Sequence, residues 1–127
     1  MNIVSRSHPL THYLWGEQCD GWNLVDTPEL SVKMERMPPH TAEQEHFHQY
    51  ARQFFFILKG RATFYFAPES AEDLPADEHK VELSPRKGLE IRPGLRHRIE
   101  NNGDEDLEFI LCSQPSTKDD RYPTKNR

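Results

Sequence analysis

Residues 46–60, HFHQYARQFFFILKG, combine two alternating histidines with an apolar run that stops at Gly60. In a β-strand, residues i and i+2 project to the same face, so His46 and His48 would aim two imidazoles at one point. A core strand has no need of such a pair, whereas two convergent imidazoles suit a divalent metal ion. A turn through QYAR would then bring Gln53 beside them on the next strand.

Short runs that favour strand over helix extend to both sides of this stretch, and frequent prolines and glycines separate them. With no convincing long amphipathic helix and no internal repeat, the pattern predicts an all-β sandwich or barrel. The run at 53–60 is apolar on both faces, which predicts a strand between two packed layers, and Lys59–Gly60 predicts a tight hairpin. The sequence predicts an exposed acidic loop at residues 67–79. It also predicts that residues 114–127 form a tail that packs loosely on the surface.

Length and composition indicate one domain over residues 1–127, with a barrel core at about 28–113 and N-terminal strands at 10–26. The net charge is −5 and basic residues form no run, so we expect no nucleic-acid partner. No segment has the length of a membrane span, and no secretory signal is visible, so we expect a cytoplasmic protein without membrane contact. Cys19 and Cys112 are expected to be free thiols.

A third histidine should complete the metal site, and His97 in IRPGLRHRIEN is the best candidate. The Pro93–Gly94 pair predicts a tight turn that leaves His97 at the start of the next strand. The predicted ligands of a divalent Zn, Mn, Ni or Fe ion are His46, His48, Gln53 and His97. Such a set leaves one or two coordination positions for water or substrate. The remaining histidines are expected at the surface, with His40 close enough to flank the mouth of the site; they are His8, His12, His40 and His79.

The first stretch resembles a motif of the cupin superfamily, G-x5-H-x-H-x3–4-E-x6-G. Here the chain has His46-x-His48-x4-Gln53-x6-Gly60, without the leading glycine. The resemblance implies a double-stranded β-helix, or jelly-roll, barrel with the metal inside, and it is strongest to small single-domain bacterial type-2 cupins.

The second motif of that family, G-x5-P-x-G-x2-H-x3-N, is matched in GLEIRPGLRHRIEN. The chain has Gly94-x2-His97-x3-Asn101. Pro93 stands directly before Gly94, so the chain is one residue short of the motif at this point. The resemblance therefore places His97 in the same ligand set as the first pair of histidines.

The family's glutamate is Gln53 in this chain, and this replacement bears on the chemistry. Neutral ligands leave a divalent ion with its full charge, which favours Lewis-acid chemistry over a higher oxidation state such as Fe³⁺. Gln53 could also stay outside the ligand set and bond to a ligand water or a histidine N–H. Some cupins that open unsaturated sugar acids are similar in their His/His/Gln/His set.

The resemblance leaves three functions open. The first is an isomerase or lyase that acts on a small carboxylate-bearing substrate such as a sugar acid. The second is a metal-dependent dioxygenase, and the third is a module that binds a small ligand or metal without catalysis. Because a small sandwich leaves open sheet edges that a second subunit would cover, we also expect a homodimer.

Overall fold

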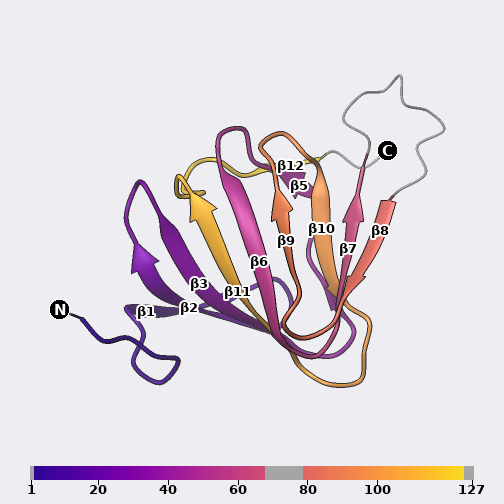
Figure 1. The fold of residues 1–127 in the computed structure, drawn as a ribbon, viewed down its shortest axis with the longest axis horizontal. Coiled ribbons are helices and arrows are strands. Elements are labelled where there is room, and N and C mark those ends of the chain that lie inside the picture. Colours follow the sequence, from indigo (N-terminus) through magenta and orange to yellow (C-terminus); the bar gives the residue numbers. More distant parts are fainter. Residues whose placement is uncertain (1, 68–78, 125–127) are drawn as a thin grey trace.

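The computed structural model describes residues 2–67 and 79–124, and in these two ranges it contains strands and no helix. The strands form two antiparallel sheets that face each other as the two layers of one barrel (Figure 1). The first sheet has the order β1 (Thr11–Trp15), β2 (Cys19–Asp26), β3 (Ser31–Met37), β11 (Leu107–Gln114), β6 (Arg52–Lys59) and β9 (Gly88–Ile91). The second has the order β12 (Tyr122–Pro123), β5 (His46–Phe47), β10 (His97–Asn101), β7 (Ala62–Phe66) and β8 (His79–Leu83), with β4 (Thr41–Ala42) also paired to β10. This all-β jelly-roll architecture confirms the predicted fold class.

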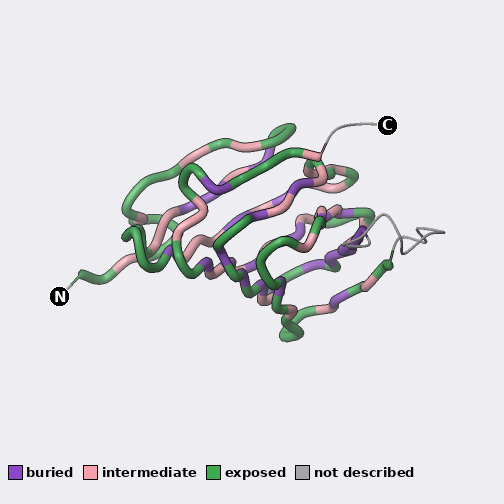
Figure 2. Tube along the Cα trace, turned by 90° about the horizontal axis from the view of Figure 1, so that it is seen from above, coloured by how far each residue is buried: buried purple, intermediate pink, exposed green. Residues whose placement is uncertain are grey.

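The core lies between the sheets, because alternate residues of each strand point inward. Buried positions accordingly alternate with more exposed ones along the chain (Figure 2). On β11 the inward side chains include Leu107 and Phe109, which are fully buried. The aromatic centre of this core pairs Phe55 of the first sheet with Phe64 of the second, at a ring-centroid distance of 5.0 Å. Cys19 and Cys112 are free thiols, as expected.

The predicted hairpin at Lys59–Gly60 is wrong. Strand β6 pairs with β11 and β9, whereas β7 pairs with β10 and β8, so the chain crosses here from one sheet to the other. Gly60 makes the crossing possible because its φ of +82° is strained for other residues. A Cβ at this position would also approach the carbonyl oxygen of Asp106 to 2.5 Å.

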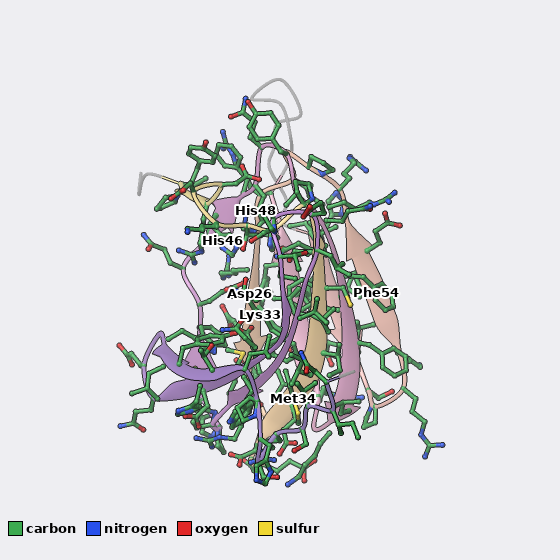
Figure 3. All side chains as sticks on the ribbon, turned by 90° about the vertical axis from the view of Figure 1, so that its left-hand side faces the viewer. Asp26, Lys33, Met34, His46, His48 and Phe54 are labelled. Carbon is green, nitrogen blue, oxygen red and sulfur yellow. The ribbon has the colours of Figure 1, made fainter. Side chains whose placement is uncertain are left out.

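The apolar run on β6 is not enclosed between two layers, contrary to prediction. Phe55 and Ile57 point into the barrel and are buried, but Phe54 and Leu58 are 42% and 41% exposed. Phe54 lies on the outer surface in Figure 3. A closed barrel gives each strand a single interior face, so an apolar residue on the other face meets solvent or a partner.

The C-terminal segment is bound to the barrel, which corrects the prediction of a loosely packed tail. Its strand β12 pairs with β5, and the ring of Tyr122 stacks on Phe47 at 5.3 Å. Asp120 is only 5% exposed. The predicted acidic loop at 67–79 lies almost wholly outside the described residues. Within the described ranges, no helix exists that could span a membrane.

Candidate metal centre

Three predicted ligands come together at one end of the barrel. His46 on β5 is paired in register with His97 on the neighbouring strand β10, and His48 follows two residues later on the same face as His46. One ligand nitrogen from each ring lies within 4.8 Å of the others. All three rings are buried, with His97 fully enclosed. Figure 3 labels His46 and His48 at this end, close to each other.

Backbone carbonyls orient all three imidazoles in the same way. The Nδ1 atoms of His46, His48 and His97 lie 2.9, 2.6 and 2.8 Å from the carbonyl oxygens of residues 44, 120 and 95. A carbonyl only accepts, so each Nδ1 carries the hydrogen and each Nε2 presents a lone pair. The Nε2 atoms of His48 and His97 are buried and have no hydrogen-bond partner among the described residues. Buried acceptors without partners are costly, and a metal ion would satisfy them.

The rings are held in the neutral form that binds metal. Burial is the main cause that lowers the pKa of His46 to about 2, followed by its proximity to His97. Burial likewise lowers the pKa of His97 to about 4 and shifts the pKa of His48 downward. Protons therefore do not compete with a cation for these nitrogens at neutral pH.

Gln53 faces the same cavity from the opposite sheet. Its Nε2 donates to Ser113 Oγ at 3.1 Å, which turns the amide oxygen away from Ser113. That oxygen is buried and has no hydrogen-bond partner among the residues described. A neutral oxygen donor is thus available beside the histidines, although β6 and β5 belong to different sheets rather than to adjacent strands. Ser113 was not recognised from sequence, but its place in the inward series of β11 is a signal that could have identified it.

Asp120 ties the C-terminal segment to the histidine pair and was also missed. Its carboxylate accepts hydrogen bonds from three successive backbone N–H groups, those of residues 49, 50 and 51, at 2.8, 3.1 and 2.9 Å. Its backbone carbonyl accepts the Nδ1 hydrogen of His48. One residue therefore fixes both the turn after the histidine pair and the orientation of His48. Nothing in the polar tail sequence marks this role.

His46 and His48 border a cavity of about 210 Å³ that is also lined by two carboxyl groups, those of Glu35 and Glu43. Burial raises the pKa of Glu35, whose carboxylate accepts a hydrogen bond from Tyr13 Oη at 2.5 Å. Burial, followed by the charge of Glu35, raises the pKa of Glu43 to about 8. Glu43 Oε1 also accepts the backbone N–H of Ile99 at 3.1 Å. Alternation along β3 places residue 35 on the same face as residues 31 and 33, and this polar face is the inner one.

Two cations complete the cavity wall, and neither was recognised from sequence. Lys33 comes from β3, and Arg121 from the segment just before β12. Figure 3 labels Lys33 below His46 and His48 on the same side of the barrel. The positive charge of Arg121 contributes to the lowered pKa of all three histidines.

The other histidines are exposed, as expected, and neither they nor Tyr50 line this cavity. His12 bonds to Asp20 at 3.0 Å on the outer surface, and His40 pairs with Asp104 at 3.4 Å. His40 is not among the residues that line the cavity, so it does not flank the mouth. Tyr50 is 65% exposed.

The donor set fits a divalent transition-metal ion. Three imidazole nitrogens and one amide oxygen are neutral, so a bound ion would keep its full charge. In such an environment a divalent ion can polarise a carbonyl or stabilise an enolate. The two glutamates could take up or return protons beside it.

Comparison with known proteins agrees with this geometry. A family model described as "Cupin domain" matches residues 33–113. A curated relative, "Polyketide synthase CurC" of Streptomyces cyaneus, is 28% identical over 79 residues, which cover 62% of this chain and 45% of the relative. The matched stretch thus spans less than half the length of that relative.

Solved structures share the fold at lower sequence identity. KdgF from a Halomonas species superposes with a TM-score of 0.75 at 14% identity, over 93% of this chain and 98% of the other. A protein from Thermotoga maritima described as "a predicted oxalate decarboxylase" superposes with a TM-score of 0.75 at 18% identity, over 91% and 100% of the two chains. At these identities the likeness concerns the fold alone.

Proposed function

Because the chain belongs to the cupin family, we propose that it is a metal-binding small cupin in which His46, His48 and His97 hold a divalent ion. We further propose an isomerase or lyase that acts on a small carboxylate-bearing or sugar-acid substrate. The observation that carries this proposal is the set of three oriented imidazoles, two of which present buried Nε2 atoms without partners among the described residues. Gln53 is proposed as the fourth, neutral ligand. A bound ion would supply Lewis-acid polarisation of a substrate carbonyl.

The chain's own groups would move the proton that isomerisation requires. Glu43 lines the cavity, so its carboxyl group is the candidate to take a proton from the hydroxyl-bearing carbon next to the carbonyl and return it to the carbonyl carbon, while the hydroxyl proton passes to the carbonyl oxygen. A pKa of about 8 supports this role, because both protonation states are then accessible near neutral pH. Glu35 raises that pKa by its charge, while the Tyr13 hydroxyl holds Glu35 in place.

Gln53→Glu tests the choice between Lewis-acid and redox chemistry. The substitution adds a negative charge to the ligand set, so metal affinity should rise and polarisation of a bound carbonyl should weaken. We expect tighter zinc binding and slower turnover of a sugar-acid or 2-oxo-acid substrate. Wild type and variant are loaded with Fe²⁺ and with Zn²⁺, and oxygen uptake and isomerisation are followed in parallel.

Three outcomes of that experiment distinguish the functions. Isomerisation by the zinc form without oxygen uptake supports the proposal. Oxygen consumption by the Fe²⁺ form with a defined substrate, absent with Zn²⁺ and enhanced by Gln53→Glu, would instead establish a dioxygenase. Metal binding without turnover in any combination would favour a non-catalytic binding module.

The homodimer, the cytoplasmic location and the single-domain division over 1–127 remain predictions. Phe54 and Leu58 support the homodimer, because both apolar side chains project from the outer face of β6. Light scattering at micromolar concentration should give twice the mass of the chain.

A further inference from the structure

Lys33 and Arg121 bring two positive charges to the cavity that His46 and His48 border. Lys33 is half-buried and Arg121 is exposed at the rim. Within 2–67 and 79–124, no carboxylate lies within ion-pairing distance of either side chain. Both cations interact electrostatically with Glu35 of the same cavity, and Lys33 Nζ lies 5.4 Å from the centroid of the Tyr13 ring, but neither cation is neutralised by a direct ion pair among the described residues. Cations that line a concave site without a direct ion pair are typical of groups that meet a ligand.

The backbone at Arg121 is anchored by the residues on either side of it. Asp120 is anchored through its carboxylate to three backbone N–H groups, and Tyr122–Pro123 pairs with β5. The guanidinium Nη2 lies 3.3 Å from His46 Nδ1. That nitrogen already donates its hydrogen to the Gln44 carbonyl, so it cannot also accept one from Arg121. The guanidinium donors therefore stay available to a ligand.

The charge balance of the cavity also favours an anion. The proposed ligand set is neutral, so a divalent ion would add two positive charges to those of Lys33 and Arg121. Glu35 and Glu43 are the carboxyl groups among the described lining residues. Burial raises the pKa of both, so they offset less positive charge than two ordinary carboxylates would.

We infer that Arg121 and Lys33 form an anion subsite that holds the carboxylate of a small organic acid while a second oxygen of the same molecule reaches the metal. The metal contact rests on the proposed function; the contact with the two cations does not. Arg121 lies outside the residues that match the family, 33–113. Thr117 and the β1–β2 turn at Gly16, which line the same cavity, lie outside them too. Recognition of the acid thus combines Lys33, the first residue of the matched range, with Arg121 of the C-terminal segment.

The test uses malate, which carries carboxylates and a hydroxyl group, and its uncharged dimethyl ester. Binding of both to the zinc-loaded protein is measured by isothermal titration calorimetry for wild type, Arg121→Met and Lys33→Met. Each substitution removes a charged hydrogen bond, so malate should bind about tenfold more weakly in each variant. The ester should bind wild type at least about tenfold more weakly than malate does.

Matched controls are Arg61→Met and Lys80→Met, two exposed cations that pair with Glu82 away from the cavity. Both should bind malate as wild type does. Zinc content is measured first on every protein, so that affinities are compared at equal occupancy. Unchanged malate affinity in Arg121→Met and Lys33→Met, or no malate binding to wild type, overturns the subsite and leaves the metal proposal standing. If wild type takes up no zinc, the metal proposal fails, and the same comparison on the metal-free protein decides the subsite.

Discussion

The two halves of the barrel interior differ in chemistry although the same strands build both. Along β11 the inward residues change from fully buried Phe109 to Ser113, and along β6 they change from fully buried Ile57 to Gln53. The register places Ser113 opposite Gln53 and Phe109 opposite Ile57, so the change occurs at the same level on neighbouring strands. One half is a dry core, and the other is a polar cavity.

This difference separates stability from chemistry. The dry half buries large side chains in close packing and stabilises the fold. The cavity half carries unpartnered polar atoms and carboxyl groups with raised pKa, which oppose folding. Strands fixed by the first half hold the second in place, so substitutions in the two halves should affect different measurements.

The largest effect is expected from Phe64→Ala in the dry half. Phe64 is fully buried and its ring packs against Phe55 and Phe66. Its truncation should lower the free energy of unfolding by about 3–5 kcal/mol through lost burial and a residual cavity. Urea denaturation of the metal-free protein measures this loss. A loss below about 1 kcal/mol would mean that this half is not the stabilising one.

A smaller effect of a different kind is expected from His48→Ala in the cavity half. The variant loses one of three proposed nitrogen ligands, so zinc affinity should fall about 100-fold or more. Competition with a chelating dye measures the affinity. His40→Ala, which alters an exposed histidine paired with Asp104, is the control and should bind zinc as wild type does. Equal zinc affinity in His48→Ala and wild type would exclude the assigned ligand set.

The smallest effect is expected from Glu43→Gln and depends on pH. The folded protein keeps the Glu43 proton up to a pKa of about 8, whereas the unfolded chain releases it near the ordinary value of 4.5. As pH rises between these values, the unfolded state is favoured and wild type loses stability.

Because glutamine has no such proton, the free energy of unfolding of Glu43→Gln should increase relative to that of metal-free wild type between about pH 5 and pH 9. The expected increase is about 1 kcal/mol or more. Denaturation at a series of pH values measures the difference. Glu90→Gln, at an exposed carboxylate paired with Arg52, should show no such trend. A pH-independent difference for Glu43→Gln would contradict the raised pKa.

The sequence predicted the parts of the fold and site that local patterns determine. The spacing of His46 and His48 within one strand requires only alternation, and the Pro93–Gly94 turn places His97 next to them. Alternation along β3 was equally visible, but it does not say which face is inside. The apolar face would ordinarily be the inner one, yet Glu35 points into the barrel because the cavity half is polar.

Long-range features could not be read in this way. The crossing at Gly60 depends on which strands pair, which local turn signals do not specify. Asp120 and Arg121 act through contacts with residues about 70 positions earlier in the chain, and the polar tail gives no sign of them. The mouth of the cavity is therefore the least predictable part of the site.

The central claim is that the three imidazoles hold one metal ion, and anomalous diffraction tests it most directly. Crystals are grown from protein purified without added nickel and loaded with zinc, and data are collected on both sides of the zinc absorption edge. We predict a single strong peak per chain, about 2.0–2.2 Å from the Nε2 atoms of His46, His48 and His97. An absent peak, or one outside this cluster, would contradict the account.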